Sequence, residues 1–107
     1  KNIALCVNWL SENRESNLYI REIPLPVRRC DIDFNNHIHN VKYLDYALES
    51  LPLEIFKNQV FKALRISYKT ATKEGEELTG KYAFIDGKHI VVIYGAEASV
   101  KALVQFE

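Results

Sequence analysis

Residues 40–52 read NVKYLDYALESLP and carry the clearest helical pattern in the chain. Apolar side chains recur there at spacings of three and four residues, as one face of a helix requires. The members of this stripe are Val41, Leu44, Leu48 and Leu51, widened by Tyr43 and Ala47. The pattern predicts a helix that Asn40 caps and Pro52 ends.

Two apolar segments precede this helix. The first alternates as a strand does and favours a strand over a helix, although the residues between its members are partly apolar too. Its alternating members are Ile3, Leu5, Val7 and Trp9. The second segment, residues 19–29, also has a strand pattern, but Pro24 and Pro26 each remove a backbone donor. It is therefore expected at an edge of the sheet.

Four strands are expected after the helix, over residues 62–69, 77–85, 88–95 and 100–106. The second and third are separated by Asp86 and Gly87, a pair suited to a tight hairpin with positive φ angles. Two of the strands have a clear apolar face. These faces consist of Leu64, Ile66 and Tyr68 in one strand, and of Val100, Ala102, Val104 and Phe106 in the other.

The order of elements is strand, loop, helix and four antiparallel strands, which predicts an α+β fold in a single domain over residues 1–107. The pattern is compatible with a sheet that curls around the helix and with a helix packed on a flat sheet. In either case the core is thin for a chain of 107 residues. We therefore expect a homodimer, or a second domain that covers the open face.

Composition excludes several classes of protein. Fourteen basic and fourteen acidic side chains cancel, so the chain lacks the charge excess typical of proteins that bind nucleic acid or membrane surfaces. The apolar stretch near the N-terminus is too short to span a bilayer.

Cys6 and Cys30 fit neither a disulfide framework nor a zinc site, so a cytoplasmic protein without metal or cofactor is expected. The chain does not begin with Met, which suggests a fragment of a longer protein.

The segment before the helix concentrates side chains that can perform chemistry. Alternate positions carry Asp31, Asp33, Asn35, His37 and His39. Each of these side chains could simply stabilise a turn or cap the helix, as Asp and Asn often do. The catalytic interpretation is that Asp33 attacks a carbonyl or activates a water, and that His37 protonates the leaving group. Asn35 and the N-terminus of the helix would then stabilise the developing oxyanion.

The stretch VRRCDIDFNNHIHNVKYLDYALESLPLEIF, residues 27–56, resembles the acyl-acyl carrier protein (acyl-ACP) thioesterase family. The second domain of that family carries a D-x-D-x-N-x-H-x-N-N block before a Tyr-containing helix that ends in LES and Pro. The resemblance implies a hotdog fold, in which a curled antiparallel sheet wraps around one long central helix. It also implies hydrolysis of fatty acyl-ACP, with Asp33, Asn35 and His37 in the catalytic positions.

Two positions depart from the family pattern. His39 stands where the family has the first Asn of its Asn pair, and Ala71 stands where the family has a Glu. Nearby carboxylates that could replace this Glu are Glu74, Glu76 and Glu77, although a solvated turn explains them as well. The missing carboxylate keeps a non-catalytic acyl-binding hotdog domain open as an alternative.

Other functions remain to be compared with this one. Hotdog thioesterases that act on coenzyme A esters also use an Asp at the position of Asp33. Hotdog hydratases separate their Asp and His by five positions, whereas Asp33 and His37 are four positions apart, and this difference counts against a hydratase.

A Cys30 nucleophile paired with His37 is a weaker alternative, because an unpaired Cys more often packs in the core. His89 is expected to be an exposed hairpin residue. Basic residues that could meet an acidic carrier protein or a coenzyme phosphate are Arg28, Arg29, Lys42 and Lys69.

Overall fold

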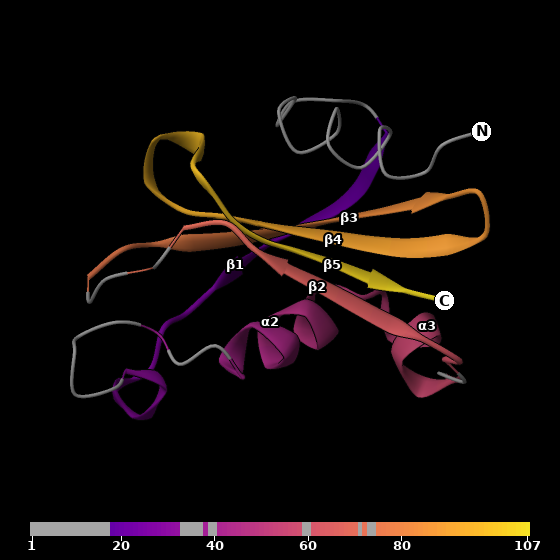
Figure 1. The fold of residues 1–107 in the computed structure, drawn as a ribbon, viewed down its shortest axis with the longest axis horizontal. Helices are drawn as coiled ribbons and strands as arrows, with labels where there is room; N and C mark the ends of the chain where they lie inside the picture. The colour runs from indigo at the N-terminus through magenta and orange to yellow at the C-terminus, as the bar shows by residue number, and fades with distance from the viewer. Residues whose placement is uncertain (1–17, 33–37, 39–40, 59–60, 71, 73–74) are drawn as a thin grey trace.

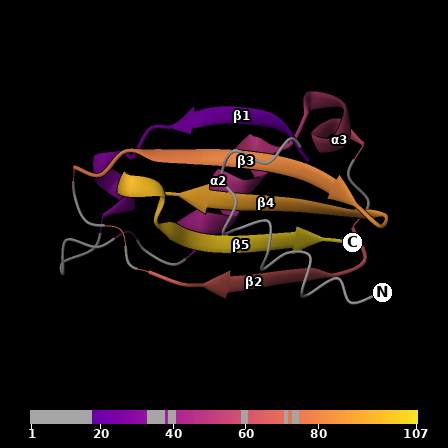
Figure 2. The same cartoon turned by 90° about the horizontal axis from the view of Figure 1, so that it is seen from above.

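The computed structural model describes residues 18–32, 38, 41–58, 61–70, 72 and 75–107, and these residues form one antiparallel sheet with α-helices on one of its faces (Figure 1). The five strands lie in the order β1-β3-β4-β5-β2, which Figure 2 shows from above. Their bounds are β1 Tyr19–Leu25, β2 Leu64–Tyr68, β3 Leu78–Ile85, β4 Lys88–Tyr94 and β5 Val100–Phe106. All four pairings are antiparallel, as the sequence predicted.

The helices are short. They are the α-helices α2, Lys42–Ser50, and α3, Leu53–Lys57, and the 3-10 turns η1, Arg29–Asp31, and η2, Ala96–Ala98. Helix α2 lies across the sheet and contacts β1, β3, β4 and β5 (Figure 1). Pro52 ends it, as predicted, but α3 directly after this proline was not predicted. No helix in the described ranges is long and apolar enough to cross a membrane.

The buried face of α2 is rotated from the predicted stripe. The side chains that α2 buries are Tyr43, Tyr46, Ala47 and Ser50. Val41 is exposed, and Leu44 and Leu48 are half-buried against the core. The prediction was therefore right for Tyr43, Ala47 and Leu51 but wrong for Val41. These polar side chains can be buried because each hydroxyl has a hydrogen-bond partner. Tyr43 pairs with Thr72, Tyr46 donates to Asp31, and Ser50 donates to the carbonyl oxygen of Tyr46.

The start of α2 is described from Val41 onward. The residue at the cap position is Val41, with no side-chain hydrogen bond to the helix, whereas we had expected Asn40. Asn40 itself lies outside the described residues. Val41 has helical backbone angles, φ −64° and ψ −21°, so the chain already follows the helix before Lys42. The predicted cap at Asn40 therefore stays a prediction.

The hairpin between β3 and β4 matches its prediction. Asp86 and Gly87 have φ angles of 51° and 77°, which is the left-handed conformation that a two-residue hairpin requires. β5 matches only in part, because a register shift separates the pair Ile93 and Ala102 from the pair Tyr94 and Val100. The irregularity turns Val100 to the opposite face from Ala102, so Val100 does not join the predicted apolar face.

Both outer strands of the sheet lie where their sequences allow. β1 contains Pro24 and is at one edge, as expected. β2 is at the other edge, and the prediction that it buries an apolar face was wrong for two of three residues. Leu64 and Tyr68 are 44% and 46% exposed, and only Ile66 packs against the core, because an edge strand is covered incompletely.

Two apolar clusters lie on opposite faces of the sheet. The larger one joins α2 to the sheet and includes Tyr43, Tyr46, Tyr82, Val91, Ile93, Val104 and Phe106. The smaller one lies on the face away from α2 and contains Ala83, Ile90, Val92, Tyr94 and Leu103. Successive side chains of β3, β4 and β5 point to opposite faces of the sheet, and both faces of these central strands are buried.

Candidate active site

The predicted catalytic residues Asp33, Asn35 and His37 lie outside the described residues, as do His39 and Ala71. The described residues on either side of 33–37 are paired with each other. Ile32 and Ile38 form an isolated antiparallel bridge, and the backbone N–H of Ile38 donates to the carbonyl oxygen of Thr72 at 2.9 Å. The ends of this segment and the connection between β2 and β3 therefore meet near the start of α2.

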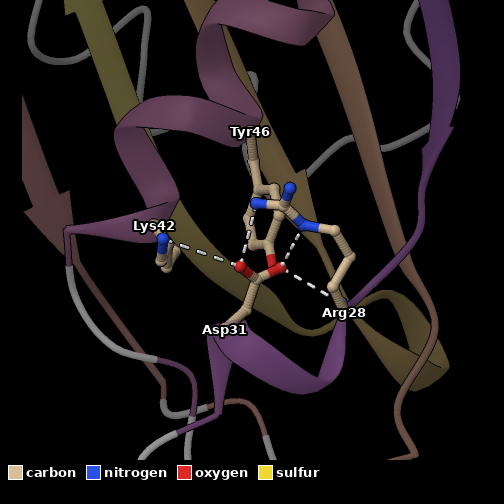
Figure 3. Close-up of polar contacts among 4 residues, drawn as sticks. All are labelled: Arg28, Asp31, Lys42 and Tyr46. Atoms are coloured by element: carbon tan, nitrogen blue, oxygen red, sulfur yellow. Dashed lines mark hydrogen bonds and ion pairs between the residues drawn. The ribbon is translucent and has the colours of Figure 1, made fainter.

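Asp31 is the central polar group of this region, and its carboxylate is fully buried (Figure 3). Arg28 donates through Nε to Oδ2 at 3.3 Å and through Nη2 to Oδ1 at 3.1 Å. Tyr46, on α2, donates its hydroxyl to Oδ2 at 2.8 Å, and the ammonium of Lys42 lies 3.8 Å from Oδ1. The carboxylate thus joins the η1 turn to the first turns of α2.

These contacts decide the charge state of Asp31. Burial by itself raises the pKa of a carboxyl group, but the hydrogen bonds from Arg28 and Tyr46 outweigh it, and the pKa of Asp31 lies below its ordinary value. For Tyr46, burial and the neighbouring carboxylate both raise the pKa of the phenol. At neutral pH Asp31 is therefore an anion, and Tyr46 is a neutral donor to it.

The local sequence explains this turn. The backbone N–H of Arg28 donates to Oδ2 of Asp31 at 3.1 Å, so the carboxylate closes the turn as well as the ion pair. The turn interpretation is thus confirmed for Asp31. Arg28 and Lys42, which we had considered as contacts for a carrier protein, are held by this carboxylate. The side chain of Cys30 lies outside the described part of the chain.

A second contact fixes α2 to the β2–β3 connection. Tyr43 and Thr72 share a hydrogen bond of 2.7 Å between Oη and Oγ1, and both side chains are buried. Burial raises the pKa of Tyr43, so its phenol stays neutral. Thr72 holds Tyr43 with its side chain and Ile38 with its carbonyl oxygen. This role could not be predicted from the sequence, because a single Thr in a loop belongs to no pattern.

An open cleft of about 820 Å³ lies beside the Asp31 cluster. Its walls come from the end of β1, the η1 turn and the start of β3, and include Val27, Arg28, Ile32 and Leu78. Glu76 and Glu77 also line it, and Glu76 pairs with the buried Lys101 at 2.9 Å. Glu76 is therefore not simply part of a solvated turn. The described residues hold no group of three or more metal-ligating side chains.

His89 belongs to a separate cluster near α3, and the prediction that it is an exposed hairpin residue was wrong. It is half-buried, and its Nδ1 lies 2.7 Å from the hydroxyl of Tyr82. The rings of Phe61 and Phe84 lie 5.7 and 4.9 Å away. Burial lowers the pKa of His89, which keeps the imidazole neutral at pH 7. On β4 it points to the helix side, where these aromatic rings cover it.

A comparison with protein families places the chain. The model of the acyl-ACP thioesterase C-terminal domain matches residues 12–105, which is most of the chain. The chain belongs to this family. The matched range includes the Asp31 cluster and the whole predicted catalytic segment, so the resemblance seen in residues 27–56 extends over nearly all of the sheet.

Curated relatives give the same family. The chain is 30% identical over 74 residues to an oleoyl-acyl carrier protein thioesterase of Arabidopsis thaliana, covering 58% of the chain and 20% of that protein. It is 39% identical over 51 residues to a palmitoyl-acyl carrier protein thioesterase of the same plant, covering 48% and 12%. Both are named chloroplastic. The chain thus spans a fifth or less of the length of these two relatives.

Solved structures confirm the hotdog fold. The 12:0-ACP thioesterase of Umbellularia californica superposes with a TM-score of 0.78 at 19% identity, over 87% of this chain and 36% of that one. A Thermus thermophilus thioesterase, complexed with coenzyme A and zinc, superposes with a TM-score of 0.72 at 14% identity. That match covers 82% of this chain and 81% of the other. The curled-sheet alternative is therefore the correct one.

Proposed function

We propose that this acyl-ACP thioesterase domain takes part in the hydrolysis of fatty acyl thioesters, with acyl-ACP as the substrate. Water adds to the thioester carbonyl, the C–S bond breaks, and the products are a fatty acid and the carrier thiol. The observation that carries the proposal is the family match over residues 12–105, which includes the segment from Asp31 to Asn40. The names of the curated relatives support the carrier-protein form of the substrate.

Asp33 supplies the carboxylate that attacks the carbonyl or activates the water, and His37 protonates the departing thiolate. Asn35 holds the reacting oxygen. This assignment follows from the position of each residue in the family block. It is supported by the pairing of Ile32 with Ile38 on either side of these residues. The buried charge of Asp31 is neutralised by Arg28 and Lys42, so Asp31 has a structural role and is not the proposed catalytic carboxylate.

Replacing Asp33 with Asn tests the assignment. The change keeps the size of the side chain and removes the carboxylate, so the rate of thiol release should fall by at least about a hundredfold. The measurement is the rate of free thiol release from a panel of acyl-ACP and acyl-coenzyme A esters. As a control, Asp33→Asn and the original chain should have the same circular dichroism spectrum and the same midpoint of thermal unfolding. Turnover of Asp33→Asn within a factor of a few of the original rate would exclude Asp33 from the mechanism.

Two other functions give different results in the same panel. A coenzyme A thioesterase would release thiol faster from the coenzyme A esters than from the carrier esters. A non-catalytic acyl-binding domain, which Ala71 in place of the family Glu favours, would bind both esters and release thiol from neither. If neither the original chain nor Asp33→Asn releases thiol from any ester of the panel, the result supports a non-catalytic acyl-binding domain.

We also propose that the domain pairs with a second hotdog domain, as a homodimer or as one half of a longer double-hotdog chain. Strand β2 is an edge strand with Leu64 and Tyr68 substantially exposed, which suits pairing along that edge. Coverage of only 36% of the Umbellularia californica thioesterase supports the double-domain arrangement. A cytoplasmic location rests on the cysteine content alone, whereas the plant relatives are named chloroplastic.

A further inference from the structure

The cleft beside the Asp31 cluster combines apolar, cationic and carboxylate side chains in one lining. It lies where β1 ends and β3 begins, which is the end of the sheet at which α2 starts (Figure 1). Its volume of about 820 Å³ is typical of sites that take a small organic group. The apolar part of the lining consists of Pro24, Leu25, Pro26, Val27, Ile32 and Leu78.

The cleft reaches the ends of the proposed catalytic segment. Ile32 lines the cleft, forms a bridge with Ile38, and directly precedes Asp33 in the sequence. Gly75 lines it as well and follows closely after Thr72, whose carbonyl oxygen accepts the hydrogen bond from Ile38. A group bound in the cleft therefore lies beside the point where the catalytic segment leaves and rejoins the described structure.

The η1 side of the cleft presents positive charge to solvent. Arg28 and Arg29 both line it. The carboxylate of Asp31, which pairs with Arg28, is fully buried, whereas the side chain of Arg28 is 62% exposed and Arg29 is exposed too. Solvent at this wall thus meets guanidinium groups and not the carboxylate, so the wall attracts anions. A guanidinium binds phosphate oxygens through paired hydrogen bonds, which makes a phosphate group a suitable ligand.

The start of β3 contributes carboxylates, Glu76 and Glu77, to the lining. Glu76 pairs with the ammonium of Lys101 at 2.9 Å, and Lys101 is only 4% exposed, so the charge of Glu76 is compensated within the structure. Glu77 is exposed, and its carboxylate can accept hydrogen bonds from N–H groups. A ligand that matches the cleft therefore has a phosphate group, an apolar stretch and N–H donors.

We propose that the cleft binds the phosphopantetheine arm of the thioester substrate, with the phosphate group of the arm on Arg29. The arm consists of a phosphate group, a dimethyl-substituted carbon chain and amide groups, which are the three features that the lining matches. Arg29 takes the phosphate because Nε and Nη2 of Arg28 already donate to Asp31. The inference rests on the proposed function, since it places the arm of an acyl thioester beside the catalytic segment. A carrier protein and coenzyme A both carry this arm.

Binding of 4′-phosphopantetheine and of pantetheine, which lacks the phosphate group, tests the role of Arg29. Calorimetry with the full chain should give a Kd for phosphopantetheine at least about tenfold lower than the Kd for pantetheine, because a hydrogen bond to a charged group is lost with the phosphate. Arg29→Gln should remove this difference. The matched control is Lys57→Gln, which removes an exposed cation on α3, at the other end of the sheet (Figure 1), and should keep the difference.

Inorganic phosphate tests whether the rest of the arm contributes. It should bind at least about tenfold more weakly than phosphopantetheine, because it makes no contact with the apolar lining. Equal affinity for the two compounds would show a general anion site and overturn the assignment of the arm. The inference also fails if Arg29→Gln keeps the preference for phosphopantetheine over pantetheine, or if the original chain binds neither compound.

The binding results are independent of the proposed hydrolysis, because neither compound is a thioester. A chain that releases thiol from acyl-ACP but does not distinguish phosphopantetheine from pantetheine would keep the proposed function and lose this inference. A chain that binds the arm through Arg29 but releases no thiol would keep the inference and lose the proposed hydrolysis. Displacement of phosphopantetheine by carrier protein that bears the arm, compared with displacement by coenzyme A, then distinguishes the two sources of the arm.

Discussion

The two faces of the sheet bury polar groups in different ways. On the helix side, the polar contacts connect separate parts of the chain: Asp31 joins the η1 turn to α2, and Thr72 joins Tyr43 to Ile38. On the other side, Lys81 and Lys101 each pair with a carboxylate at the border of an apolar patch. The first arrangement sets the position of a loop, whereas the second closes a hydrophobic layer. The Asp31 cluster, which is next in sequence to the proposed catalytic residues, belongs to the first arrangement.

The largest effect on this comparison should come from Asp31→Ala. The substitution leaves the hydroxyl of Tyr46 buried without its acceptor and removes the carboxylate that Arg28 and Lys42 share. Breaking a buried pair costs about 3–5 kcal/mol, and the low end applies because the Arg28 side chain is 62% exposed. We expect a loss of about 3 kcal/mol in the free energy of unfolding, measured by urea denaturation.

The pH dependence provides the control. The pKa of Asp31 is lower in the folded chain than in the unfolded chain, so its contribution is present above the unfolded value of about 4. That contribution is lost as the pH falls through the folded value. The stability difference between the original chain and Asp31→Asn should therefore shrink between about pH 6 and pH 3. A difference that stays constant over this range would show that the charge of Asp31 contributes nothing.

Gly80→Ala should have the next largest effect, because it tests how tightly α2 packs on its face of the sheet. A methyl group at Gly80 would overlap Oγ of Ser50 and lie 3.1 Å from a methyl carbon of Leu25. Overpacking of this kind costs about 2 kcal/mol. Unfolding of Gly80→Ala, Ser50→Ala and the double variant would be compared, and the double variant should recover part of the loss. If the effects of Gly80→Ala and Ser50→Ala on the free energy of unfolding simply add, then α2 moves away from the sheet to accommodate the new methyl group.

The strands and the helix could be predicted because their patterns repeat over many residues. Alternation located all five strands that the structure describes, and Pro52 located the end of α2. The face of α2 was harder to predict, because apolarity favoured Val41 while hydrogen bonding buried Tyr46. Strand periodicity also could not show the irregularity that turns Val100. Such local shifts depend on tertiary contacts, which a periodic pattern does not contain.

The candidate site shows the same division. The block from Asp31 to His37 was identified from its density of polar side chains, and the family match includes it. The roles of Arg28, Tyr46 and Thr72 were missed, since each depends on one contact between residues far apart in the sequence or at a turn. A buried Tyr hydroxyl needs a partner, so the tyrosines of the helix could have suggested a nearby carboxylate.

Removing one hydroxyl on each face should have effects equal to or smaller than that of Gly80→Ala. Tyr43→Phe leaves the buried Oγ1 of Thr72 without its partner phenol and should cost about 2 kcal/mol. Tyr94→Phe should cost about 1 kcal/mol, because Tyr19 is only half-buried and water can replace the lost contact. The double variant should be additive within about 0.5 kcal/mol, since the two pairs lie on opposite faces of the sheet.

Activity separates the two substitutions further. Thr72 holds Ile38 through its carbonyl oxygen, so loosening Thr72 should lower kcat of the proposed hydrolysis in Tyr43→Phe while Tyr94→Phe leaves it unchanged. Thiol release and urea denaturation on the same samples measure both effects. A drop in kcat for Tyr94→Phe as large as that for Tyr43→Phe would contradict the division between a face that positions the loop and a face that only closes the core.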